Sequence, residues 1–163
     1  MATCLSLVAD WRIRMIRKLL ATSDDSVLTA LRLVLGIVMF AHGAQKVLGW
    51  FGGYGYSGTM QFFTGTLHIP APLGILSMVA EFAGSLGLIV GLLGRVAALG
   101  ILVNMVVAVL KAHAPNGFFM NWAGNQKGEG FEFHLLAIVI ALAILVRGSG
   151  AFSIDRWITR DRV

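Results

Sequence analysis

VLTALRLVLGIVMFAHGAQKVL, residues 27–48, is an apolar run that ends with three polar side chains. A membrane-spanning helix needs about 20 residues to cross a hydrocarbon core of about 30 Å, and this run is long enough. His42, Gln45 and Lys46 are three and four residues apart, so a helix places them on one face. That face meets either water or something polar inside the protein.

The composition of the whole chain assigns it to the integral membrane proteins. Of its 163 residues, 57% are hydrophobic and 13% are charged, and the mean hydropathy is +0.80. A soluble domain normally has about 25% charged residues. A water-soluble fold of this length would have to bury nearly all of its surface, which it cannot do.

Four apolar segments are separated by polar or glycine-rich sequence. They cover residues 27–48, 73–93, 96–110 with an extension toward His113, and 133–146. The first two are long enough to span, and the third is if it reaches His113. The fourth must recruit Glu132 or Arg147, and its shortness either draws Glu132 and His134 toward the membrane or leaves them wet beside a thinned bilayer. We expect an all-α, four-helix transmembrane bundle.

The domain organisation follows from these segments. Residues 1–26 form a basic N-terminal segment, 27–148 the transmembrane domain and 149–163 a C-terminal tail. The single cysteine, Cys4, lies in the first segment, so an intramolecular disulfide is excluded. In the first loop, Ser57 is expected to cap a short amphipathic helix that carries Met60, Phe63 and Leu67 on one side.

Lysine and arginine are divided unevenly between the two ends of the bundle. One end holds most of them: Arg12, Arg14, Arg17, Lys18, Arg95, Arg147, Arg156, Arg160 and Arg162, and the other holds Lys46, Lys111 and Lys127. The positive-inside rule then places both termini in the cytoplasm and the two longer loops outside. The net charge of +5 comes from the cytoplasmic ends and calls for no nucleic acid partner.

The tryptophans agree with this arrangement, because tryptophan prefers the headgroup level. Trp11 and Trp157 fall at the cytoplasmic interface, and Trp50 and Trp122 at the external one. Residues 11–20 alternate basic and apolar side chains, so they either lie along the cytoplasmic interface or form a disordered basic tail.

Nearly every polar side chain within the spans falls in the outer half of the bundle. The candidate ligand-binding residues are His42, Gln45, Lys46, Glu81, Asn104, Lys111, His113, Glu132 and His134. Charges inside a membrane are costly unless they face a partner or a cavity, and they mark functional sites by default. The alternative is structural: Glu81 pairs with Lys46 or Lys111, and Glu132 with the other lysine.

Metal or haem binding is not expected. His42, His113, His134, Glu81 and Glu132 have the right chemistry for ligands, but the sequence has no close histidine spacing such as HxxxH. Near the inner end of the first span, Arg32 either pairs with Asp155 or extends to lipid headgroups, and we expect a structural role for both.

The sequence resembles the DoxX family of small four-helix bacterial membrane proteins over residues 27–157. The motifs that carry the resemblance are Arg32 with Gly36, HGxxKxxGWF from His42 to Phe51, Glu81-Phe82, GLLGR at residues 91–95, GFF at 117–119, Glu132, GSG at 148–150 and SID at 153–155. Named members include a subunit of a thiosulfate:quinone oxidoreductase, and others are membrane partners of redox enzymes. The resemblance implies the membrane fold, a location in the bacterial inner membrane and a quinone-linked role.

Two hypotheses about function follow, from different classes. The first is a membrane subunit of a quinone-linked oxidoreductase. Hydrogen bonds to the quinone would come from Lys46, Lys111, His42 or Asn104. Protons would be relayed by Glu81 or Glu132, and a redox partner protein would supply electrons. The second is a non-catalytic scaffold or assembly factor that holds a periplasmic or membrane partner. A small-solute transporter is a third reading, and it would need a homo-oligomer.

Overall fold

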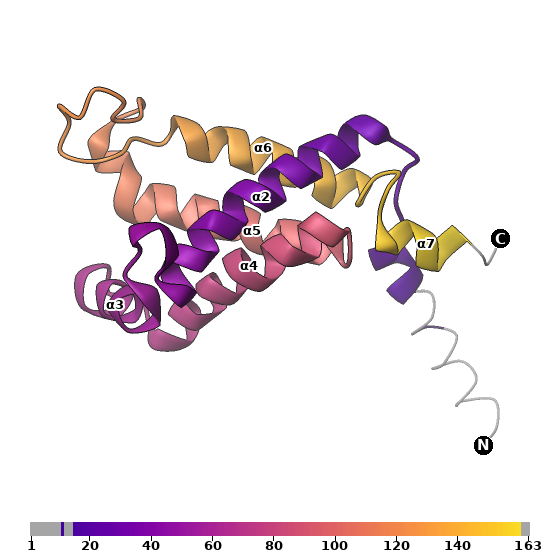
Figure 1. Cartoon of the computed structure of the whole chain (residues 1–163), viewed down its shortest axis with the longest axis horizontal. Helices are drawn as coiled ribbons and strands as arrows, with labels where there is room; N and C mark the ends of the chain where they lie inside the picture. Colours follow the sequence, from indigo (N-terminus) through magenta and orange to yellow (C-terminus); the bar gives the residue numbers. More distant parts are fainter. Residues whose placement is uncertain (1–10, 12–14, 161–163) are drawn as a thin grey trace, which may run out of the picture.

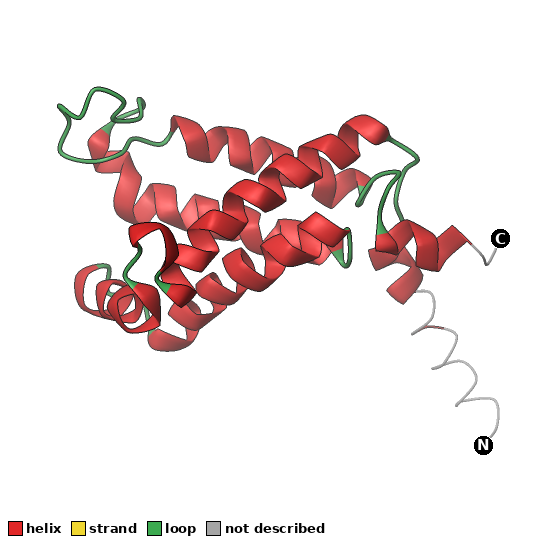
Figure 2. Ribbon diagram, viewed as in Figure 1, coloured by secondary structure: helices red, strands yellow, loops and turns green. Residues whose placement is uncertain are grey.

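The computed structural model describes residue 11 and residues 15–160. Within the described residues all regular secondary structure is helical, with no strand, and loops join the helices (Figure 2). Its elements are α2 (Ser26–Leu48), η1 (Trp50–Gly52), α3 (Gly55–Gln61), η2 (Phe62–Thr66), α4 (Ala71–Val90), α5 (Gly94–Ala108), η3 (Val109–His113), η4 (Ala114–Asn116), α6 (Glu132–Arg147) and α7 (Ile154–Arg160). Residues 15–20 are also helical. Cys4, Arg12, Arg14 and Arg162, used above, lie outside the described residues.

In the part of the chain that the structure describes, three helices are long and apolar enough to cross a membrane: Ser26–Leu48, Ala71–Val90 and Gly94–Asn116. The third reaches past His113 because a π-helical turn, η3, continues α5, which confirms the expected extension. Helix α6 has 16 residues. At 1.5 Å per residue it covers about 24 Å of a core of about 30 Å, so a fourth crossing stays a prediction.

The four long helices form one bundle whose core contains Leu35, Met39, Leu88, Ile101 and Ile144. Helix α2 packs mainly against α4, and α5 packs against both α4 and α6. Glycines permit the closest approach between helices. A Cβ on Gly43 would lie 2.7 Å from Phe82 Cα, so α2 and α4 meet backbone to backbone at this point.

The two ends of the bundle differ in what they carry. Both described chain ends lie at one of them, the terminal end (Figure 1). The Ser23 amide donates to Arg147 O at 3.1 Å, and the Ala151 amide donates to Asp25 O at 3.1 Å, which ties the two chain ends together. The loops of residues 49–70 and 117–131 form the opposite, loop end. The side of the membrane that each end faces remains a prediction.

The short helix in the first loop exists, but it begins differently from the expectation. Helix α3 starts at Gly55, with no side-chain cap, so Ser57 lies inside the helix and does not cap it. Gly55 has a φ of +65°, a left-handed conformation that glycine adopts at no steric cost. Thr59 and Phe63 are buried, and the helix packs on α2.

Candidate functional site

Glu81 is the buried acid at the centre of a polar cluster that joins three helices. It lies on α4 and is 2% exposed. Lys46 Nζ of α2 donates to its Oε2 in an ion pair, and Asn104 Nδ2 of α5 donates to its Oε1 at 2.6 Å. Ser77 Oγ donates to Asn104 Oδ1 at 2.7 Å. The expected pairing of Glu81 with a lysine is confirmed, and we call these four residues the loop-end cluster.

Close helix packing sets the depth of the loop-end cluster. Gly43 comes three residues before Lys46, and a Cβ there would meet the backbone of α4 at Phe82 and Glu81. On the other side of α4, a Cβ on Gly100 would lie 3.1 Å from Ala80 Cβ. These small contacts bring three helix backbones together about one turn from the charged groups, so the side chains reach one another inside the bundle.

The polar face near the loop end of α2 lines a cavity. His42, Gln45 and Lys46 form one wall of a space of about 270 Å³. The rest of its lining comes from the first loop and the helix after it: Gly52, Gly53, Tyr54, Thr59, Phe62 and Phe63. The polar wall therefore faces an aromatic one, and sequence reasoning missed the aromatic half because it depends on how α3 folds back. We call this space the polar cavity.

Lys46 connects the polar cavity with the buried acid. Its side chain is 28% exposed, whereas that of Glu81 is 3% exposed. One lysine thus lines the cavity and binds a carboxylate that is out of contact with solvent. Gln45 is committed to local structure as well, because its Nε2 donates to Phe51 O at 3.3 Å.

His113 and His134 form a pair near the loop end, with ring centroids 4.0 Å apart. His113 Nδ1 lies 2.9 Å from Glu129 O, and it must carry a proton because a carbonyl oxygen only accepts. His134 is 5% exposed, and within the described residues its Nδ1 has no hydrogen-bond partner. His42 lies nearby, with its ring 5.7 Å from that of Phe133.

Two candidates lie apart from the loop-end cluster. Glu132 Oε1 accepts hydrogen bonds from the Met120 amide at 2.9 Å and from Trp122 Nε1 at 3.1 Å. Its carboxylate therefore holds the second loop. Among the described residues it forms no ion pair, so the structural alternative that paired Glu132 with a lysine is wrong. Lys111 lies on η3 with an exposed side chain, and it is Lys46 that binds Glu81.

Arg32 and Asp155 are both buried at the terminal end, each 1% exposed. Within the described residues no ion pair joins them and Arg32 is buried, so the structure has neither of the two alternatives, a direct Arg32–Asp155 pair or an Arg32 that extends to lipid headgroups. They are connected instead through Ser149, whose carbonyl accepts from Arg32 Nε at 2.8 Å and whose hydroxyl donates to Asp155 Oδ2 at 2.5 Å. We call Arg32, Ser149 and Asp155 the capping cluster.

The physical reason is that each charge caps a helix end. Arg32 donates to the carbonyls of Leu88 and Ile89 in the last turn of α4. Asp155 accepts from the amides of Leu93 at 2.8 Å and Gly94 at 3.0 Å, where α5 begins. A cation is favoured at a helix C-terminus and an anion at an N-terminus. The sequence alone did not indicate that the tight turn between α4 and α5 would sit between the two charges.

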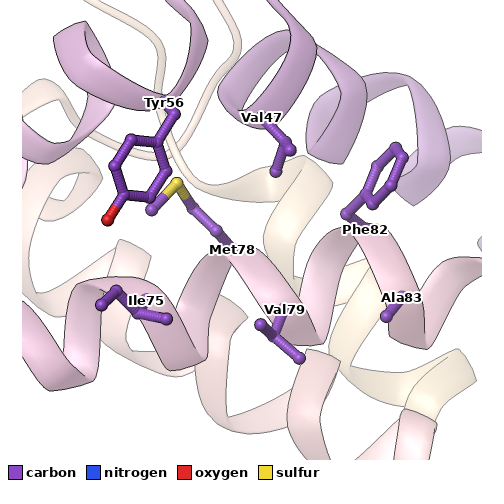
Figure 3. Close-up of a pocket in the computed structure, with 7 residues that line it drawn as sticks. All are labelled: Val47, Tyr56, Ile75, Met78, Val79, Phe82 and Ala83. Atoms are coloured by element: carbon purple, nitrogen blue, oxygen red, sulfur yellow. The ribbon is translucent and has the colours of Figure 1, made fainter.

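A second, apolar cavity lies on the other side of α3. It has a volume of about 210 Å³ and is lined by Val47, Tyr56, Ile75, Met78, Val79, Phe82 and Ala83. Figure 3 shows these side chains converging from α2, α3 and α4. Val47 follows Lys46 directly, so the two cavities flank the same turn of α2. Among the described residues, no group of three or more His, Cys, Asp or Glu side chains could hold a metal ion.

Long apolar helices around a buried acid–lysine pair define a small, multi-helix membrane protein. The DoxX family model matches residues 27–114, and the chain belongs to that family. Over 134 residues it is 26% identical to a Bacillus subtilis (strain 168) protein named "Putative oxidoreductase CatD", covering 81% of this chain and 87% of that one. No solved structure matches the chain. A multi-helix membrane protein of the DoxX family is thus the class that the fold and the comparisons support together.

Proposed function

We propose that the chain is the membrane subunit of a quinone-linked oxidoreductase and that the polar cavity receives the quinone head group. The observation that carries the proposal is the position of Lys46, which lines the cavity and holds the buried Glu81. A lysine paired with a buried acid inside an apolar bundle is the kind of group that marks a functional site in membranes. The similarity to a protein named as an oxidoreductase supports the redox part of the proposal.

The size of the polar cavity limits what it can hold. Its volume of about 270 Å³ is below the range of about 300–1,000 Å³ that is usual for pockets of drug-sized ligands. A single aromatic ring with its carbonyl groups is therefore a better match than an entire lipid-soluble quinone. The ring would face Phe62 or Phe63, and the tail would lie outside the cavity, along the apolar helix surfaces.

The residues of the cavity have the chemistry that the reaction needs. A bound quinone would accept two electrons and two protons, with the electrons supplied by a partner enzyme. Lys46 donates a hydrogen bond toward the cavity and stabilises negative charge that develops on an oxygen there. Glu81 would exchange protons behind it. Asn104 donates to the Glu81 carboxylate, and Ser77 donates in turn to the Asn104 side-chain oxygen, which holds the amide in place.

The second candidate is a scaffold, and one observation favours it. Both oxygens of Glu81 already have partners, one from α2 and one from α5. A fully satisfied network can hold three helices in register without any ligand. In that case the loop-end cluster would be structural, and the loops at that end would bind the partner protein.

One pair of measurements separates the two functions. Glu81→Gln keeps the shape and one accepting oxygen but removes the exchangeable proton. We expect the variant to insert and to co-purify with its partner normally, while quinone reduction in membranes falls by about 10²-fold or more, the contribution of a positioned acid–base group. Lys46→Met should have the same effect, and the matched control Lys111→Met, at an exposed lysine of the same end, should not.

The outcomes of this experiment are distinct. Normal assembly with normal quinone reduction in both Glu81→Gln and Lys46→Met would contradict the quinone proposal. Loss of partner co-purification in both variants would favour the scaffold, because breaking a buried pair then destabilises the bundle that holds the partner.

A further inference from the structure

Helix α7 has its polar and apolar faces reversed relative to a helix that packs in water. Its inward side holds Asp155 and Thr159, and Asp155 is 1% exposed. Its outward side holds Trp157, 72% exposed, and Ile158, 42% exposed. A surface helix normally turns its apolar stripe to the core and its polar side to water. The apolar face of α7 therefore requires a neighbour that is itself partly apolar.

The capping cluster fixes α7 in this orientation. The Asp155 carboxylate binds the Leu93 and Gly94 amides, and the Asp155 amide donates to Gly91 O at 2.9 Å. Turning α7 to hide Trp157 would break these buried bonds and leave the start of α5 without its cap. The reversed orientation is thus enforced from inside the bundle.

The apolar face of α7 continues an apolar stripe along α6. Leu136, Val139 and Val146 are 62–67% exposed and three to seven residues apart on α6, so they form one side of that helix. The segment that joins the two helices adds Phe152, which is 76% exposed. Helix α6 packs beside helices that are long enough to span. The predicted crossing by α6 would place this stripe against acyl chains, and its continuation at the terminal end would then fall at headgroup depth.

Exposed basic side chains lie at the same end of the bundle. Arg147, the last residue of α6, and Arg160, the last of α7, are both exposed. Arg156 forms an ion pair with Asp24. The hydrogen bond that Arg156 donates to the Asp24 carboxylate lowers the pKa of that carboxyl. Arg160 follows Trp157 by three residues on α7, and both it and Arg147 are exposed and form no ion pair within the described residues. Exposed arginines at the end that carries an exposed tryptophan are typical of segments that lie on an anionic membrane surface.

We propose that α7 is an in-plane membrane-surface helix, in which Trp157 and Ile158 insert at headgroup level and Arg147 and Arg160 bind anionic phospholipid headgroups. The proposal is independent of the proposed quinone function, because the polar cavity lies at the opposite end of the bundle. Its physical basis is the fixed outward apolar face, the continuity with α6 and the charge of the two exposed arginines.

The test uses the full chain with Trp157 as its only tryptophan, the other three having been changed to phenylalanine. The chain is reconstituted either in vesicles of neutral phospholipid or in vesicles of neutral phospholipid mixed with anionic phosphatidylglycerol. The lipids carry bromine either near the headgroup or deep in the acyl chain, and iodide is the aqueous quencher. We expect the shallow bromolipid to quench Trp157 on the order of twofold more than the deep one, and iodide to quench it weakly. A second chain with Trp122 alone, which is 87% exposed in the second loop, is the comparison.

The charge component is tested with Arg147→Gln and Arg160→Gln. Each arginine near an anionic surface should strengthen the docked state about fivefold, so the double variant should lose the gain in shallow quenching that anionic lipid produces. Equal quenching in neutral and anionic vesicles before mutation would overturn the headgroup part. Full quenching by iodide with none by bromolipid would place α7 in water and overturn the proposal. Protection of Trp157 from both iodide and the bromolipids would show that protein covers the apolar face of α7, and this would overturn the proposal that lipid covers it.

Discussion

The capping cluster gives the sharpest prediction about stability, because replacing Arg32 with lysine keeps the charge and removes the geometry. The guanidinium uses three nitrogens to reach four carbonyl oxygens, those of Ser149, Leu88, Ile89 and Phe152. A lysine has one nitrogen at the end of its chain and cannot span acceptors from α4 and from the segment between α6 and α7. We expect Arg32→Lys to lose at least two of the four bonds.

The magnitude follows from the number of bonds lost. A hydrogen bond to a charged group contributes about 1.5–3 kcal/mol, so losing two lowers the free energy of unfolding by about 3–6 kcal/mol. Native proteins are stable by about 5–15 kcal/mol in total, so the effect would be large. The measurement is equilibrium unfolding of the detergent-solubilised chain, followed by circular dichroism.

Two further variants make this prediction specific. Arg147→Lys changes an exposed arginine at the same end and should stay within about 0.5 kcal/mol of the wild type. Asp155→Asn keeps the size of the side chain but replaces one accepting oxygen with a donor, which then faces the Gly94 amide or the Ser149 hydroxyl. We expect this change to lower the free energy of unfolding by about 1–3 kcal/mol. If the free energy of unfolding of Arg32→Lys lies within about 1 kcal/mol of the wild-type value, the four bonds do not stabilise the fold to the expected extent.

The remaining predictions concern packing and topology. Gly43→Ala places a Cβ 2.7 Å from Phe82 Cα, so α2 and α4 must separate, and we expect a loss of about 1–3 kcal/mol of stability. The control is Gly65→Ala, where a Cβ meets nothing within 4 Å, and it should be neutral. Equal effects of the two variants on stability would argue against a tight α2–α4 contact. Cysteine introduced at Asn125 should react with an impermeant maleimide in intact spheroplasts, and cysteine at Arg160 should not, because the basic residues gather at the terminal end. The reverse labelling pattern would invert the topology.

Much of the fold could be predicted from the chain because it depends on local patterns. Apolar runs of about 20 residues can satisfy their backbone in lipid only as helices, so the spans of α2, α4 and α5 followed from hydropathy and length. The pairing of Glu81 with a lysine was also predictable, since an unpaired charge inside a span is too costly. The start of α3 was not, because Gly55 begins the helix through its backbone conformation and not through a capping side chain.

What the sequence by itself determined is therefore the class of the protein, the extent of its long helices and the need for Glu81 to have a basic partner. The tertiary structure alone decided which partner each charge has: Lys46 for Glu81, loop groups for Glu132, and two helix ends for Arg32 and Asp155. The physical reason is that hydropathy and periodicity act along one helix, whereas a buried polar group is satisfied by whatever the neighbouring helix ends and loops bring within about 3 Å. That choice depends on where the backbones touch, at glycines such as Gly43, and on where the chain turns.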